Sequence, residues 1–307
     1  MSPAPRRRVP ATALAVGAIV SVQFGNAIAG STFSEVGSLG AATLRLVFAA
    51  IILMVVIRPR MHGWSRRTWV GVGLLGLGLG GMNALIYLAI ERIPIGVAVT
   101  IELLGPLAVA VAGTRRARDL LWVCLAAVGV LLLGIDRGGS FAIDGALFAA
   151  GAAAFWALYI VASARLGASH DGAPAPRGVD ALAVAMVVAA VLVAPIGATQ
   201  ARDAVLANPT MVAVFVGIAV MTSAVPYALE FIALKTMPTR VFGVLSSLGP
   251  AVAALAGLVV LSQVLSALQL VAIAAVIAAS IGAVWGAAPR RGRAPAVSGP
   301  GVVPPLG

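Results

Sequence analysis

The amino-acid sequence predicts an all-α integral membrane protein of ten transmembrane helices, organised as two inverted five-helix repeats. Three observations predict this fold class. Hydrophobic residues make up 61% of the chain and charged residues 10%, with a mean hydropathy of +1.07, which is too apolar for an ordinary soluble domain. Apolar stretches of about 20 residues, the length that crosses a bilayer, recur along the chain. A pattern of prolines and glycines also repeats 144 residues apart, which indicates an internal duplication.

The expected spans cover residues 11–30, 37–57, 70–90, 95–112, 120–135, 144–164, 179–199, 211–234, 241–261 and 265–287. The first of them follows a basic N-terminus and resembles a secretory signal. Gln23 and Asn26, three residues apart, would be odd in a signal but suit a polar helix face directed into a bundle. We therefore expect this segment to remain as the first helix of the bundle.

Basic residues predict the orientation of the helices. The net charge is +11, and if the N-terminus lies in the cytoplasm, 17 basic residues fall in cytoplasmic segments while only Arg92, Arg137 and Arg202 face outward. Short cytoplasmic loops carry such an excess in membrane proteins. The pattern predicts cytoplasmic termini and an even number of spans, and it explains the basic balance through the lipid bilayer rather than through nucleic acid.

The expected organisation has five parts. Residues 1–10 form a basic cytoplasmic N-terminus, 11–135 the first five-helix repeat, 136–143 a linker, 144–287 the second repeat and 288–307 a disordered cytoplasmic tail. The tail is assigned from its content of proline, glycine and arginine. Whether the protein pairs with itself is left open by the sequence.

No metal ion or cofactor is expected. Cys124 is the only cysteine, and His62 and His170 fall in loops without ligand-forming neighbours. The expected spans contain no histidine, so the ligands or base of an intramembrane enzyme are missing. A scaffold or receptor subunit is a further alternative, but it would need no carboxylate inside the membrane.

Polar residues of the second and third spans point to a site. A charged side chain at the bilayer centre costs about 2.5 to 3.5 kcal/mol, so Arg45 should face the bundle interior and have a partner. The alternatives are a structural ion pair, a side chain that snorkels toward the interface, and a docking cation for a substrate carboxylate. Asn83 and Tyr87 share one helix face, which we expect to line a cavity. The same span contains a G-x-G-x-x-G pattern, but without a strand before it the pattern does not indicate a nucleotide site. Gly76 and Gly80 are instead spaced for close helix packing.

Two expected spans are broken by proline. Pro106 has no N–H and should free the main-chain carbonyl of Glu102, which places a carboxylate and an unpaired carbonyl at one position. Pro250 should free the carbonyl of Ser246 in the same way. The repeat brings these breaks into register, since Pro94, Pro106 and Gly113 recur as Pro238, Pro250 and Gly257.

The eighth span carries Ser223, Tyr227 and Glu230 on one face, and Pro226 should free the carbonyl of Thr222. Of the ten acidic residues, only Glu102 and Glu230 fall well within expected spans, a scarcity that marks both as functional candidates.

The sixth span carries Trp156, Tyr159 and Ser163 on one stripe. Such an aromatic stripe is more typical of packing than of binding, although a buried tyrosine hydroxyl needs a partner.

Five spans in each half would insert the second half upside down relative to the first. Inverted repeats with interrupted helices near the midplane are typical of secondary transporters, which alternate access around a central site. Unpaired backbone at that depth is tolerated where it lines a cavity. The fourth and ninth helices are therefore expected to line the transport pathway.

The chain also resembles a known family. The segments SVQFGNAIAGSTF, GAATLRLVFAA, GGMNALIYLAI, IPIGVAVTIELLGPLAVAV, AAAFWALYI, SAVPYALEFIAL, MPTRVFGVLSSLGPAVAAL and LQLVAIAAVIAASIGA are similar, in the same order, to blocks of EamA-type transporters in the drug/metabolite transporter superfamily. The strongest similarity is to those of the bacterial inner membrane that export threonine and homoserine. The resemblance covers about residues 11–287 and implies ten helices in two repeats and proton-driven efflux of small amino acids.

The residues that match the family pattern are Arg45, Asn83, Tyr87, Glu102, Gly105, Pro106, Trp156, Tyr159, Pro226, Tyr227, Glu230, Pro238 and Arg240. Two places depart from it. The family has Glu-Pro where this chain has Gly249-Pro250, and Gly-Glu where it has Ser262-Gln263. The loss of two carboxylates puts the substrate and the coupling ion in question.

The resulting hypothesis is a plasma-membrane antiporter of amino acids and protons. Glu102 and Glu230 would exchange protons and hold the substrate ammonium group, and Arg45 would hold its carboxylate or neutralise Glu102. Asn83, Tyr87, Pro106, Trp156, Tyr159, Tyr227 and Ser246 complete the expected binding site. Export of another metabolite or organic cation, such as a drug or polyamine, is the alternative, because a buried glutamate among aromatic residues suits such cations equally well.

Overall fold

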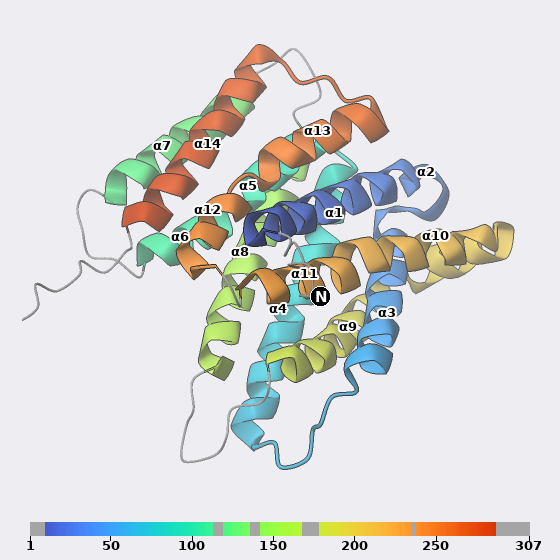
Figure 1. Ribbon diagram of the computed structural model, residues 1–307. Coiled ribbons are helices and arrows are strands. Elements are labelled where there is room, and N and C mark those ends of the chain that lie inside the picture. Colours follow the sequence, from blue (N-terminus) through green and yellow to red (C-terminus); the bar gives the residue numbers. More distant parts are fainter. Residues whose placement is uncertain (1–9, 113–118, 136–141, 168–177, 235–236, 287–307) are drawn as a thin grey trace, which may run out of the picture.

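A computed structural model describes residues 10–112, 119–135, 142–167, 178–234 and 237–286, and the regular structure in these ranges is entirely helical (Figure 1). Outside the described residues lie 1–9 of the expected N-terminal segment, 136–141 of the expected linker and all of the expected tail 288–307.

In the first half of the chain, the helices are α1 (Ala11–Ser31), α2 (Phe33–Val36), α3 (Ser38–Ile57), α4 (Arg66–Ile90), α5 (Ile95–Glu102), α6 (Leu104–Ala112) and α7 (Asp119–Ile135). In the second half they are α8 (Ile143–Gly167), α9 (Gly178–Ala207), α10 (Thr210–Ala219), a π-helix (Val220–Ala224), α11 (Val225–Leu234), α12 (Thr239–Ser246), α13 (Gly249–Leu261) and α14 (Ala267–Gly286).

Nine helical segments of the described chain are long and apolar enough to cross a membrane. The expected fifth span is also helical, as α7, but its apolar part covers only Leu121–Leu133. The 17 residues of α7 span about 25 Å at the helical rise, roughly one turn short of the hydrocarbon thickness. The ten-span count therefore stays a prediction.

Helices of the first half pack largely on helices of the second. The helix α1 lies against α11 and α13, while α8 lies against α4, α5 and α6. The other close pairs are α3 with α9, α5 with α13, and α7 with α14, and Figure 1 shows this last pair side by side at one edge of the bundle. The two halves thus build one interlocked bundle.

Glycines of α4 allow two neighbouring helices to approach closely. A Cβ on Gly76 would lie 2.5 Å from the Cβ of Val188 on α9, and one on Gly80 would lie 3.3 Å from the backbone of the same helix. On another side of α4, a Cβ on Gly78 would lie 3.0 Å from the backbone nitrogen of Tyr159 on α8. The glycine-rich stretch therefore serves helix packing, as small residues do in membrane bundles.

Both predicted proline breaks are present. The helix α5 ends at Glu102 and α6 begins at Leu104. Pro106, in the first turn of α6, has no N–H to donate to the carbonyl of Glu102 four residues earlier. In the second half, α12 ends at Ser246 and α13 begins at Gly249. The breaks lie at matching positions of the repeat.

The break in the eighth span differs from expectation. The chain is π-helical over Val220–Ala224, and the N–H of Val225 donates to Val220 O, five residues back. In that register the carbonyl left without a partner by Pro226 is that of Met221 rather than Thr222. Ser21 on α1 donates its hydroxyl to Met221 O at 2.6 Å, so a side chain of another helix satisfies the freed carbonyl.

Candidate functional site

Arg45 lies in the bundle interior, as its charge predicts. It is 7% exposed, and its Nη1 donates to Asn26 Oδ1 at 2.8 Å and to the Tyr87 hydroxyl at 3.2 Å. The guanidinium carbon also lies 5.3 Å from the centroid of the Tyr87 ring, a favourable cation–π distance. Phe33 of α2 packs on Tyr87, with 5.4 Å between the centroids of the two rings. The Nε atom of Arg45 has no hydrogen-bond partner among the described residues.

Glu102 is the last residue of α5, directly before the break. It is 8% exposed, and no described residue forms a hydrogen bond or an ion pair within 4 Å with its carboxylate. Arg45 is the charged group that acts on it electrostatically. The structure therefore places the two charges in one region without a direct ion pair, because the arginine bonds Asn26 and Tyr87 instead.

A second carboxylate lies within electrostatic range of two tyrosines. Glu230 on α11 is half-buried, four residues before the end of that helix at Leu234. Tyr159 on α8 and Tyr227 on α11 both lie within electrostatic range of Glu230, and Tyr227 is also within range of Arg45. Tyr227 thus lies within electrostatic range of both the glutamate and the arginine.

The remaining expected site residues have local roles in this structure. Asn83 is buried and donates its amide to Leu79 O on its own helix at 2.8 Å. Ser246 donates its hydroxyl to Phe242 O at 3.0 Å, at the end of α12. Trp156 and Pro106 are half-buried. The structure thus brings together Arg45, Tyr87, Glu102, Tyr159, Tyr227 and Glu230 and leaves these four with intrahelical or packing contacts.

The two departures from the family pattern have different surroundings. Gln263, in the connection between α13 and α14, accepts a hydrogen bond from the N–H of Ile95 at 3.0 Å and so caps the start of α5. Gly249 is buried at the start of α13, and a Cβ there would meet only Gln23, with 3.6 Å to its Nε2. Gln263 therefore caps a helix, and Gly249 leaves room beside the buried amide of Gln23.

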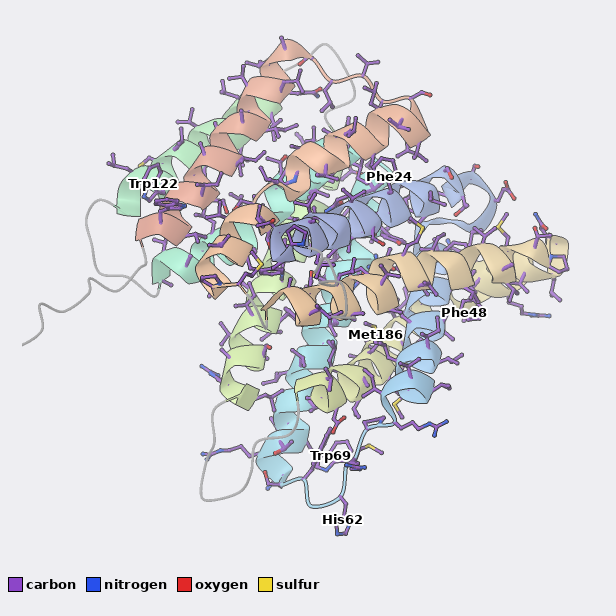
Figure 2. All side chains as sticks on the ribbon, viewed as in Figure 1. Phe24, Phe48, His62, Trp69, Trp122 and Met186 are labelled. Carbon is purple, nitrogen blue, oxygen red and sulfur yellow. The ribbon has the colours of Figure 1, made fainter. Side chains whose placement is uncertain are left out.

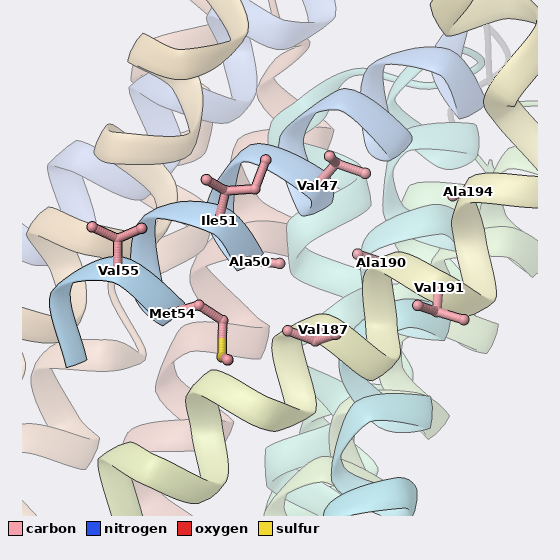
Figure 3. A pocket seen from close by; sticks show the side chains of 9 residues that line it. All are labelled: Val47, Ala50, Ile51, Met54, Val55, Val187, Ala190, Val191 and Ala194. Atoms are coloured by element: carbon pink, nitrogen blue, oxygen red, sulfur yellow. The ribbon is translucent and has the colours of Figure 1, made fainter. Parts of the chain in front are cut away.

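An apolar groove of about 450 Å³ lies elsewhere, between α3 and α9 (Figure 3). The lining side chains are Val47, Ala50, Ile51, Met54, Val55, Val187, Ala190, Val191 and Ala194. It offers no polar group to a charged substrate, and Ile51, Val55 and Val191 are among the well-exposed apolar residues of the membrane helices. The groove thus belongs to the surface that faces lipid.

The described residues contain no group of three or more histidine, cysteine, aspartate or glutamate side chains able to hold a metal ion. His62 lies in the loop between α3 and α4, at the extremity of the molecule (Figure 2). Cys124 is exposed on α7. His170 falls outside the described residues.

Sequence reasoning did not identify two neighbours of Arg45 and Tyr87, nor the side chain that bonds the freed carbonyl of the eighth span. Asn26 was assigned to a polar helix face, but nothing in the sequence showed that it bonds Arg45. Phe33 and Ser21 gave no signal, because their contacts depend on how α2 folds back and on the register of a π-helix.

The fold and the site together define a polytopic helical membrane protein with a buried polar centre at broken helices. The family model described as the EamA-like transporter family matches residues 143–285. Over a longer range, the threonine/homoserine exporter RhtA of Salmonella typhimurium (strain SL1344) is 41% identical over 267 residues, which cover 86% of this chain and 88% of that protein. The protein of the same name from Escherichia coli (strain K12) is 39% identical over the same coverage.

The chain belongs to the EamA-like transporter family, which confirms the resemblance seen in its sequence. It is a bacterial multi-pass inner-membrane protein, and a transporter rather than an enzyme. A solved structure, a crystal structure of a protein, covers 90% of this chain and 97% of its own, with a TM-score of 0.50 and 21% identity. That likeness concerns the fold alone.

Proposed function

We propose that this protein exports small amino acids of the threonine and homoserine kind across the inner membrane by proton antiport. The single observation that carries the substrate class is the 41% identity, over 86% of the chain, to a protein named for threonine and homoserine export. The buried polar centre at the helix breaks supports it, because a zwitterion needs a cationic and an anionic partner inside an apolar bundle.

The proposal includes the finer architecture: ten spans, two inverted five-helix repeats and cytoplasmic termini. The helix pairing supports this symmetry. Exchange of the two repeats would turn the contact of α1 with α11 into that of α8 with α4, and the contact of α1 with α13 into that of α8 with α5 and α6. It would leave the pairs of α3 with α9 and α7 with α14 unchanged, as expected of a pseudo-two-fold arrangement.

In this mechanism Arg45 holds the substrate carboxylate. No described residue accepts a hydrogen bond from its Nε, and an arginine fork binds a carboxylate through two donors at once. Tyr87 and Asn26 orient the guanidinium through Nη1. Tyr159, Tyr227, Trp156 and Ser246, with Asn83 and Pro106, would complete the walls of the pathway.

Glu102 and Glu230 would bind the substrate ammonium group and a proton alternately. An ionised carboxylate attracts the substrate ammonium, and protonation from the outside removes that attraction and releases the amino acid. Apolar surroundings make such proton uptake possible near neutral pH. Glu102 is suited to this exchange because no direct ion pair with a described residue fixes its charge.

The test is efflux of labelled threonine and homoserine from loaded cells without their own exporters. Wild type should accelerate efflux, and Glu102→Gln should abolish the gain although it is expressed equally. Glu35→Gln is the matched control, because Glu35 is an exposed glutamate on α2, and it should leave efflux unchanged. Equal efflux from wild-type and empty cells would refute the proposed substrate class.

Proton coupling needs a separate measurement in reconstituted vesicles. An inward proton gradient should drive threonine uphill with wild type, and Glu102→Gln and Glu230→Gln should each lose the dependence on the gradient. If both variants keep the pH dependence of wild type, proton coupling through these two residues is wrong.

Export of an organic cation is the second candidate. The observation that favours it is that Glu230 lies within electrostatic range of Tyr159 and Tyr227, since a carboxylate together with aromatic rings suits lipophilic cations. Competition between threonine and a cationic dye for efflux distinguishes the two. If the dye inhibits threonine efflux while threonine leaves dye efflux unchanged, the organic cation is the favoured substrate.

A further inference from the structure

A buried amide on α1 has no role in the mechanism so far. Gln23 is 9% exposed, and its Oε1 has no hydrogen-bond partner in the part of the chain that the structure describes. Buried side-chain acceptors are almost always bonded in folded proteins, so an orphaned one calls for an explanation. Asn26, one turn further along the same helix, is in contrast bonded to Arg45. Gln23 therefore lies beside the polar centre without belonging to its internal hydrogen bonds.

The opposite side of this amide is formed by Gly249. The glycine is buried at the break between α12 and α13, yet a Cβ placed on it would meet no atom of the described chain within 4 Å except Gln23 Nε2, at 3.6 Å. Most glycines of this bundle differ from it, since a Cβ on Gly25, Gly76 or Gly105 would collide with a neighbouring helix. The position thus combines burial with room for additional atoms.

The hydrogen-bonding groups of a buried side-chain amide are complementary to those of a hydroxyl group. Gln23 offers two N–H donors and a carbonyl acceptor, and a hydroxyl both donates and accepts. Rotation of the terminal amide exchanges its two ends, so either can face the space beside Gly249. In the proposed mechanism Arg45 and Glu102 bind the charged ends of the amino acid, which leaves the amide for the side chain of the substrate.

We propose that Gln23 is a specificity-determining residue, whose amide hydrogen-bonds the side-chain hydroxyl of the exported amino acid in the space beside Gly249. This inference rests on the proposed function and adds the feature that separates hydroxylated from apolar substrates. A site built around a hydrogen-bonding group rejects an analogue that lacks the group, because the protein partner is then left unpaired.

The experiment compares substrates that differ only in the hydroxyl. Threonine is paired with valine, and homoserine with norvaline, in efflux from cells that express wild type, Gln23→Met or Gln23→Glu. Wild type should prefer the hydroxylated member of each pair. Gln23→Met, similar in size but apolar, should lower that preference about tenfold, the effect of one lost hydrogen bond. Gln23→Glu keeps an acceptor and should retain the preference over the apolar analogue.

Gln269→Met is the matched control. Gln269 is similarly buried, at 6% exposed, but its Oε1 already accepts from the N–H of Ser266, so its loss should change both members of a pair equally. Gly249→Ala provides a second variant should Gln23→Met fail to reach the membrane. Its Cβ fits in ordinary contact distance and crowds the amide, so it should lower the preference as well.

The outcomes separate this inference from the proposed function. Efflux with an unchanged preference in Gln23→Met and Gly249→Ala would overturn the role of Gln23 alone. Lack of threonine and homoserine efflux with wild type would overturn the proposed function and this inference with it.

Discussion

Replacement of Ser21 by alanine should destabilise the protein through a carbonyl on another helix. Ser21 Oγ lies 2.6 Å from Met221 O, and Pro226 offers no N–H to that oxygen. Without the hydroxyl, a carbonyl in an apolar environment loses its partner, which costs about 1 to 3 kcal/mol. Because serine and alanine differ by one atom, no cavity adds to this loss. The Ser21→Ala variant should therefore unfold at a lower denaturant concentration than wild type.

The same reasoning predicts a rescue. Pro226→Ala restores a backbone N–H, so the carbonyls of this turn gain a donor that does not depend on α1. In that background Ser21→Ala should cost little, giving a coupling energy of about 1 to 2 kcal/mol between two residues. Equilibrium unfolding of the four proteins in detergent, followed by tryptophan fluorescence, measures the cycle. An equal loss from Ser21→Ala in both backgrounds would show that the hydroxyl does not replace the missing N–H.

Three further substitutions test other contacts. Gly105→Ala should cost about 1 to 3 kcal/mol, because the new Cβ would collide with the backbone carbonyl of Ala153; an unchanged unfolding midpoint would contradict the close approach of α6 and α8. Gln263→Ala should cost about 1 kcal/mol and speed hydrogen exchange of the Ile95 amide, which loses its acceptor; exchange at the wild-type rate would show that the cap is absent. Tyr87→Phe keeps the ring over the guanidinium but removes a hydrogen bond of 3.2 Å, so the protein should lose about 1.5 kcal/mol and transport should fall; wild-type stability would argue against that bond.

Much of the helical framework could be predicted from the sequence, because bilayer thickness and proline chemistry act locally. The breaks after Glu102 and Ser246 follow from Pro106 and Pro250 alone. The interior position of Arg45 follows from the cost of a charge in lipid. The helix breaks and the interior position of Arg45 each follow from the chemistry of one residue in a lipid bilayer, so their prediction needs no knowledge of tertiary contacts.

The partners of these residues could not be predicted in the same way. An ion pair between Arg45 and Glu102 was one of the alternatives, but the guanidinium bonds Asn26 and Tyr87, a choice that depends on how α1, α3 and α4 cross. The free carbonyl at Pro226 was assigned to Thr222, and a shift of one residue in the π-helix moved it to Met221. Such register and crossing details arise from packing between distant segments.

The cap that Gln263 places on Ile95 joins the connection between α13 and α14 to the first turn of α5. A glutamine amide neither gains nor loses a proton in the physiological range. The strength of this hydrogen bond therefore does not change between acidic and neutral pH, whereas that of a bond to a glutamate at the same position would change as the carboxylate takes up or loses a proton. The hydrogen bond between Gln263 and Ile95, which joins the two halves of the chain, is therefore insensitive to acidity.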